Sequence, residues 1–139
     1  MSKKSLKLLV VMLRAAQTVE DLVKKDMRRY GINPTEFAVL ELLYNRGEQP
    51  IQKIGKKILL ASSSITYVID QLEKKGLVKR IDCPEDRRSK LATITDEGKQ
   101  FMDEAFPKHE ERIDQIFSHM TEEEMDTAIE ILKKIGLQE

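Results

Sequence analysis

Apolar side chains recur at helical spacing along most of the chain, and this pattern predicts six helices and one β-hairpin. The first predicted helix covers residues 3–29 and ends at Gly31, a residue type that commonly follows a helix. Its polar side chains occupy one narrow strip, and apolar side chains cover most of the remaining circumference. A single neighbouring helix cannot cover so wide an apolar face.

The start of the second helix is marked by capping residues. In the segment from Asn33 to Glu36, we expect Asn33 to be the N-cap and Glu36 to reach back to it. Proline at the first helical position is typical of such a start. Gly47 ends this helix, and a short third helix is predicted for residues 50–58.

The fourth helix is predicted to run from Ser62, its expected N-cap, to Lys75 and to stop at Gly76. One set of its side chains has the i, i+3, i+4, i+7 spacing of a buried face. The residues of this face are Ile65, Val68, Ile69 and Leu72.

The hairpin follows this helix. Residues 77–83 and 91–94 resemble strands, and residues 84–90 are predicted to form the polar turn between them. Thr95 then caps a long acidic helix, which we expect Pro107 to kink or to deprive of one hydrogen bond. A capping box at residues 121–124 opens the last helix.

This order of elements predicts a mainly α fold with a small β-hairpin, in one domain of residues 1–139. Residues 33–95 form a winged helix-turn-helix, and residues 1–30 and 96–139 form flanking dimerisation helices. The surplus apolar surface of these end helices predicts a homodimer.

The charge is unevenly distributed, although 24 basic and 24 acidic residues balance overall. Residues 50–93 carry ten basic and five acidic side chains, a net charge of +5. Residues 94–139 carry five basic and thirteen acidic side chains, a net charge of −8. A basic middle segment provides one face suited to phosphates.

Other features of the sequence exclude several classes of protein. A single cysteine excludes an internal disulfide and favours a reducing compartment. No stretch approaches the length of a membrane span, so we expect a cytoplasmic protein without a membrane partner. We find no nucleophile with its base, no phosphate loop and no metal-ligand cluster, and therefore expect no enzyme activity, cofactor or metal.

The fourth helix and the hairpin carry the residues predicted to bind DNA. Small hydroxyl side chains let the start of the fourth helix approach base edges closely, although the same serines are also typical of a helix cap. Two arginines at the hairpin tip are suited to the minor groove, and we expect the carboxylate of Asp86 to orient them. The predicted set is Ser62, Ser63, Ser64, Thr66, Tyr67, Gln71, Lys74, Asp86, Arg87, Arg88 and Lys90.

Four short motifs resemble the signature of the MarR family of bacterial transcriptional regulators. They are Leu72-Glu73-Lys74-Lys75-Gly76-Leu77-Val78, Arg80, Asp86-Arg87-Arg88 and Thr95-Asp96-Glu97-Gly98. The resemblance implies a homodimer with interlocked end helices, with recognition helices in successive major grooves and wings in the flanking minor grooves of a palindromic operator. Three further segments are similar to the MhqR-like branch of quinone- and phenol-responsive repressors: Ser5–Leu8, Asn33–Leu43 and Phe106–Glu110.

The resemblance also implies a switch, because members of this family are commonly released from DNA by small aromatic ligands or by cysteine oxidation. Cys83, at the base of the hairpin, is a candidate redox residue or an incidental surface cysteine. A candidate ligand pocket lies between the DNA-binding lobe and the dimer helices, although such a stripe of side chains is also typical of a core. Its residues are Met12, Phe37, Leu40, Phe101, Met102, Phe106 and His109.

We therefore predict a sequence-specific DNA-binding transcriptional regulator, a homodimeric repressor of a palindromic operator. A small aromatic or phenolic ligand, or an electrophile, is expected to relieve the repression. The alternative is a winged-helix module that binds a protein partner and has no DNA specificity.

Overall fold

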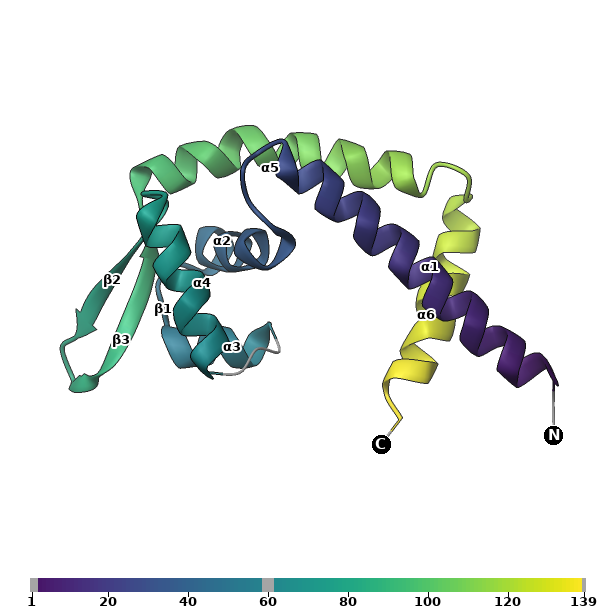
Figure 1. Ribbon diagram of the computed structural model, residues 1–139, viewed down its shortest axis with the longest axis horizontal. Helices are drawn as coiled ribbons and strands as arrows, with labels where there is room; N and C mark the ends of the chain where they lie inside the picture. The colour runs from purple at the N-terminus through teal and green to yellow at the C-terminus, as the bar shows by residue number, and fades with distance from the viewer. Residues whose placement is uncertain (1–2, 59–61, 139) are drawn as a thin grey trace.

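The computed structural model describes residues 3–58 and 62–138, and only the backbone of Ser62, Ser63 and Arg87 (Figure 1). The elements are α1 (Lys3–Arg28), α2 (Pro34–Arg46), β1 (Gln49–Pro50), α3 (Ile51–Lys57), α4 (Ser62–Lys74), β2 (Val78–Cys83), β3 (Asp86–Ile94), α5 (Asp96–Ile116) and α6 (Glu122–Gly136). This is the predicted mainly α fold with a hairpin.

Helix α5 forms the upper edge of the molecule and connects its two parts (Figure 1). On one side is the lobe, which we define as α2, α3, α4 and the three strands. On the other side α1 and α6 extend away from the lobe as the arm. The helix is continuous through Pro107 and is gently arched in this view, so the proline neither breaks it nor kinks it sharply.

The helix ends follow from local side-chain hydrogen bonds. Asn33 Oδ1 accepts from the backbone N–H of Glu36 at 2.8 Å, and Glu36 Oε1 accepts from the backbone N–H of Asn33 at 3.0 Å. This is the predicted capping box. The box predicted at Thr121 and Glu124 forms in the same way.

Apart from shifts of one residue at the ends of some elements, three predictions about the secondary structure were wrong. Residues 84–90 are not all turn: Asp86 pairs with Cys83, so the turn is two residues long and β3 begins at Asp86. The register then shifts between Asp82 and Cys83. Backbone pairing across the hairpin extends the strand despite the low strand propensity of these polar residues. Ser62, predicted to be the N-cap of α4, already lies within the described helix.

The third correction concerns the sheet, which has three strands in the order β1-β3-β2 rather than the two predicted. In the additional strand, Gln49 pairs with Ala92 and Pro50 with Leu91. A strand of two residues is too short to produce a periodic pattern in the sequence.

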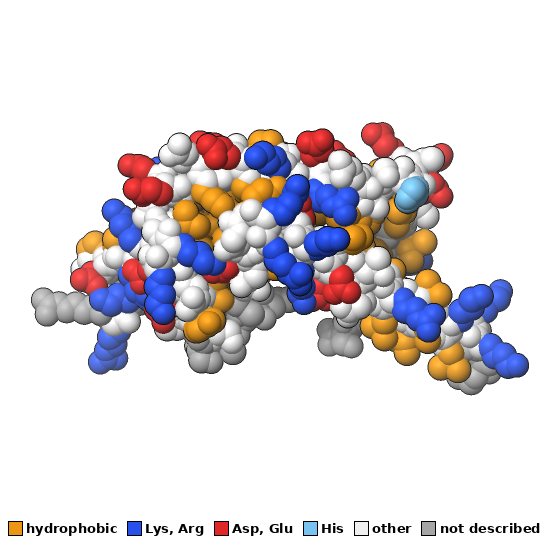
Figure 2. All heavy atoms as spheres, turned by 45° about the horizontal axis from the view of Figure 1, so that its top comes forward, with side chains coloured by type: hydrophobic (Ala, Val, Ile, Leu, Met, Phe, Trp, Pro, Cys, Tyr) orange, Lys and Arg blue, Asp and Glu red, His pale blue; other side chains and the backbone are white. Residues whose placement is uncertain are grey.

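The hydrophobic core lies inside the lobe and beneath α5. The predicted inward face of α4 is confirmed, because all four of its apolar residues are buried. The arm differs: α6 contains no buried residue. Figure 2 shows hydrophobic side chains exposed along the arm at its lower right. The exposed large apolar residues of α1 and of the α6 region are Leu6, Leu8, Leu9, Val10, Val11, Leu13, Ile129, Ile131, Leu132 and Leu137.

Candidate nucleic-acid interface

Helix α4 is held in the lobe by its apolar face, which leaves the opposite face available for contact with a partner. Tyr67 is 64% exposed, and Gln71 is half-buried. The other predicted contact residues with described side chains are exposed: Ser64, Thr66 and Lys74. Ser62 and Ser63 lie in the first turn of α4, but their side chains are outside the described part of the structure.

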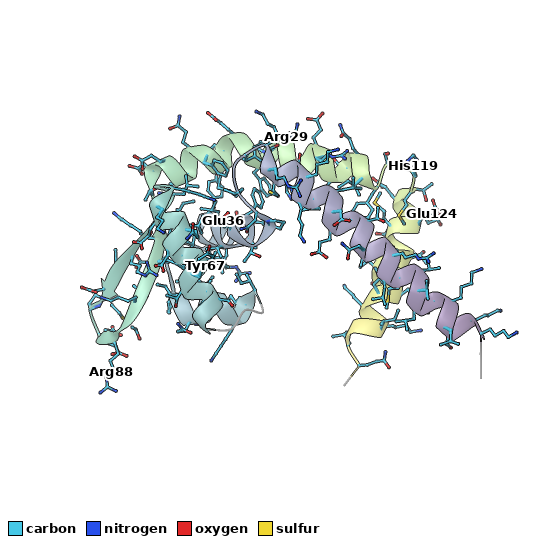
Figure 3. The ribbon with its side chains drawn as sticks, in the orientation of Figure 1. Arg29, Glu36, Tyr67, Arg88, His119 and Glu124 are labelled. Carbon is cyan, nitrogen blue, oxygen red and sulfur yellow. The ribbon has the colours of Figure 1, made fainter. Side chains whose placement is uncertain are left out.

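The β2–β3 hairpin forms the wing, and Arg88 points away from the body of the protein at its tip (Figure 3). The carboxylate of Asp86, expected to orient the arginines of the tip, does not bind the guanidinium of Arg88. Its Oδ1 instead accepts from the backbone N–H of Arg88 at 2.9 Å, and its Oδ2 accepts from Ser89 Oγ at 3.2 Å. A short aspartate side chain reaches a backbone group two residues along more easily than the end of a long side chain. The Arg87 side chain is not described, and Lys90 pairs with Asp82.

A cleft of about 230 Å³ lies between the wing, the first residues of α3 and α4, and Arg80 is among the wing residues that line it. It brings Thr66 on α4 together with Arg88 and Lys90 on the wing, which are more than twenty positions away in the sequence. The N-terminal end of α4 and the wing tip lie at the same lower edge of the lobe (Figure 1). The predicted recognition helix and the predicted wing therefore present one continuous surface.

Arg80 connects these two elements. From the sequence it was noted as a basic residue and as part of the family signature, but not as a contact between α4 and the wing. Its Nη2 lies 2.6 Å from Asp70 Oδ1 and donates to the backbone carbonyl of Thr66 at 3.3 Å. Its Nη1 pairs with Glu73. The sequence feature that could have indicated these contacts is the pair of acidic residues on α4, Asp70 and Glu73, which are three positions apart.

A second ion pair, also missed from the sequence, joins α2 to the end of α4. Lys75 Nζ donates to Glu36 Oε1 at 2.9 Å, to Glu36 Oε2 at 2.8 Å and to the carbonyl of Gly31 at 2.9 Å. Glu36 is therefore both a capping residue and the partner of Lys75, although its side chain is only 4% exposed.

The motif Thr95-Asp96-Glu97-Gly98 has a structural explanation. Thr95 Oγ1 accepts from the backbone N–H of Gly98 at 2.9 Å and donates to the carbonyl of Gly76 at 2.7 Å. A Cβ at Gly98 would lie 2.2 Å from the carbonyl oxygen of Leu77 and 2.6 Å from Ile94 Cγ1. Only glycine allows α5 to begin this close to the base of the wing.

The seven residues of the candidate ligand pocket do not form one cavity. Leu40 and Met102 are fully buried in the core, and Phe101 packs on Tyr30, with 6.5 Å between ring centroids. Met12 does not line the hollow described next.

Phe37 and His109 line a hollow of about 510 Å³ where α1, α2 and α5 meet. Their ring centroids are 4.6 Å apart, and Phe106 stacks on the Phe37 ring at 6.4 Å. The other residues that line the hollow are Val23, Met27, Pro34, Ala38, Glu41, Leu42, Asn45, Arg46 and Ile58.

A buried carboxylate lies beside His109, although it does not line this hollow. The Asp26 side chain is 1% exposed, and its Oδ2 lies 3.7 Å from His109 Nδ1. Neither atom has a hydrogen-bond partner among the described residues. The other Asp26 oxygen accepts from Arg29, and this hydrogen bond raises the pKa of Arg29, with a smaller contribution from Tyr30. The sequence did not reveal Asp26, because its position in the polar pattern of α1 is unremarkable.

The remaining candidate chemistry is sparse. The Cys83 side chain is half-buried. Within residues 3–58 and 62–138 we find no group of three or more His, Cys, Asp or Glu side chains placed to hold a metal ion. In the same part of the chain, no helix has the length and apolarity that crossing a bilayer requires.

Comparison with known proteins shows which family combines these features. The sequence pattern of the MarR family matches residues 32–90, which include α2, α3, α4 and most of the wing. The chain is 50% identical to the HTH-type transcriptional regulator MhqR of Bacillus subtilis over 99% of this chain and 94% of that protein. It is 44% identical to the regulator YkoM of the same organism over 97% of this chain and 88% of that protein.

Solved structures agree with the fold. The crystal structure of Sco3205, a MarR family transcriptional regulator from Streptomyces coelicolor in complex with DNA, has a TM-score of 0.91 and 26% identity over 100% of this chain and 94% of that one. The resemblance predicted from the short motifs is confirmed. This chain belongs to the MarR family, and it is a transcriptional regulator rather than an enzyme.

Proposed function

We propose that two copies of this chain bind a palindromic operator and repress transcription from it. Each copy places α4 in a major groove and inserts the tip of its wing into the flanking minor groove. The observation that carries this proposal is the continuous surface formed by the exposed face of α4, the cleft of about 230 Å³ and Arg88. The complex of Sco3205 with DNA supports the same use of this fold.

The distribution of charge also favours DNA over a protein partner. The basic segment of residues 50–93 contains α4 and the wing, whereas acidic side chains lie along the upper edge of the molecule (Figure 2). Phosphates are attracted to the first surface and repelled from the second. The alternative of a winged-helix protein-interaction module is therefore not favoured.

The apolar side chains of the arm support a homodimer. Leu6, Leu13 and Leu132 are all more than half exposed in a single chain. Soluble monomers rarely expose a contiguous apolar patch of this extent. A second copy related by twofold symmetry covers it and presents two copies of α4 to the two halves of a palindrome.

DNA binding is tested by selecting bound fragments from genomic DNA and measuring their affinity across a range of salt concentrations. We expect selection of a palindrome, with an affinity that falls steeply as salt rises, because phosphate contacts release counterions. Indifference to DNA at low salt would overturn the proposal.

The role of the wing is tested with Arg88→Ala. We expect its affinity for the selected operator to fall by roughly 5- to 150-fold, which corresponds to about 1–3 kcal/mol. The control is Lys99→Ala, which removes an exposed cation from α5. Equal affinity of the Arg88→Ala variant and the parent protein would remove the wing from the proposed interface.

We further propose that the hollow lined by Phe37 and His109 takes a small aromatic or phenolic ligand that releases the protein from DNA. Its volume of about 510 Å³ is in the range of small-molecule sites, and its aromatic faces suit a planar ring. It lies where the lobe meets α1 and α5, so a bound ligand there acts on the orientation of α4 relative to the arm.

The experiment compares phenol and catechol with the electrophile 1,4-benzoquinone. We expect the phenols to raise the melting temperature and to release operator DNA, both in the parent protein and in Cys83→Ser. Ala38→Leu, which fills part of the hollow, should bind DNA and lose the response. Release by benzoquinone alone, abolished in Cys83→Ser, would instead assign the switch to the cysteine.

A further inference from the structure

Arg80 on β2 makes four contacts with α4. Its guanidinium contacts Asp70 at 2.6 Å, pairs with Glu73, and donates to the carbonyl of Thr66 at 3.3 Å. Its backbone N–H donates to Glu73 Oε2 at 3.1 Å. Glu73 therefore holds both the main chain and the side chain of one wing residue.

The positive charge of Arg80 is neutralised by these contacts. Two carboxylates share one guanidinium, and the Arg80 side chain is only 25% exposed. An arginine neutralised in this way contributes little to phosphate binding, because a phosphate would have to compete with both carboxylates. The planar guanidinium reaches two carboxylates and a carbonyl in one fixed geometry, which a lysine ammonium does not reproduce.

The position of Arg80 along the wing is also significant. Val78, two residues nearer the base, is buried in the core. Nearer the tip, Asp82 pairs with Lys90 and Asp86 accepts from Ser89, and these contacts join wing residues to each other. Arg80 thus connects the wing to α4 at a point between the buried base of the wing and the projecting tip of the wing.

We propose that Arg80, held by Asp70 and Glu73, is a positioning residue that sets the angle between the wing and α4. It acts through Arg88, by presenting that side chain at the distance from α4 that separates a major groove from the flanking minor groove. This inference rests on the DNA-binding function proposed above. It assigns Arg80 no direct contact with DNA.

Glu73→Gln distinguishes a phosphate contact of Arg80 from wing positioning by Arg80, because the two roles predict opposite changes in operator affinity. If Arg80 contacted a phosphate, the loss of the Glu73 charge would release the guanidinium, and both the affinity and the salt dependence would increase. If Arg80 positions the wing, the same substitution weakens operator binding and reduces hydroxyl-radical protection in the flanking minor groove. We expect the second result, with guanine N7 protection in the major groove retained at saturating protein.

A double-variant cycle tests whether Arg80 acts through Arg88. We expect Arg80→Gln to lower operator affinity by roughly 5- to 150-fold, no more than Arg88→Ala does. In the Arg88→Ala background, Arg80→Gln should have no further effect, because residues that act in series are not additive. Arg80→Lys, which keeps the charge without the planar fork, should resemble Arg80→Gln.

Melting temperatures of all variants separate wing positioning from loss of the fold. A general loss of structure lowers major-groove and minor-groove protection together, including in the Arg88→Ala background. Additive losses, tighter binding by Glu73→Gln, or full activity of Arg80→Lys would each overturn the inference. If the parent protein binds its operator, any of these results would overturn the inference about Arg80 and leave the proposed DNA-binding function intact. If the parent protein does not bind DNA, the proposed DNA-binding function itself is refuted.

Discussion

Replacing Lys75 with methionine should destabilise the lobe, because it removes the only cation that contacts Glu36 in the described part of the structure. The Glu36 side chain is 4% exposed, and after the substitution one of its oxygens still accepts from the backbone N–H of Asn33. The other oxygen loses its partner and the carboxylate loses its counter-charge. The carbonyl of Gly31 loses a donor as well.

The magnitude follows from the burial of the two partners. Removing one member of a fully buried ion pair costs about 3–5 kcal/mol. Here the Lys75 side chain is 35% exposed, so water reaches one end of the pair and the cost is lower. We expect a loss of about 2–3 kcal/mol in the free energy of unfolding, which lowers the melting temperature of a chain of this size by roughly 6–12 °C.

The measurement is urea unfolding followed by circular dichroism, at one protomer concentration for every variant, because association stabilises the folded state by mass action. Glu36→Gln keeps the capping hydrogen bonds and removes the charge. The double variant Glu36→Gln with Lys75→Met should therefore recover most of the stability lost by Lys75→Met alone. Lys74→Met, at the exposed neighbouring position, should change the unfolding free energy by no more than about 0.5 kcal/mol.

Two results would refute this reasoning. One is a Lys75→Met variant as stable as the Lys74→Met control. The other is a double variant whose loss equals the sum of the two single losses, which would mean that Glu36 and Lys75 do not interact energetically.

Two other predictions concern the base of the wing and the dimer. Gly98→Ala should lose about 1–3 kcal/mol of unfolding free energy, because its Cβ meets the backbone of Leu77, whereas Gly136→Ala, with open space around it, should lose none; equal stability of the two variants in urea would contradict the close approach. Leu132→Asp should convert the dimer to a monomer in sedimentation velocity, because it places a charge in the apolar face of α6; an undiminished dimer would exclude this part of α6 from the interface.

The sequence by itself determined the helices and their order. The capping boxes at Asn33 and Thr121 form between residues three positions apart, so the sequence pattern and the structure record the same local interaction. The buried face of α4 was equally predictable, since helical periodicity determines which side chains share a face. The family resemblance followed from motifs within these elements.

Tertiary structure alone decided which distant residues meet. The pairing of Gln49 with Ala92 and the contact of Lys75 with Glu36 join segments about forty residues apart, and no local pattern encodes their partners. The Asp86 carboxylate could accept from a backbone N–H or from a guanidinium, and the geometry of the hairpin places the backbone N–H of Arg88 within its reach. Similarly, Phe37 and Leu40 lie on one helix, but only the packing of α1 and α5 places the first at a hollow and the second in the core. Local interactions thus determine which segments form helices and strands. The angles at which these elements pack determine the position of the wing, the contacts of Arg80 with α4 and the hollow lined by Phe37 and His109.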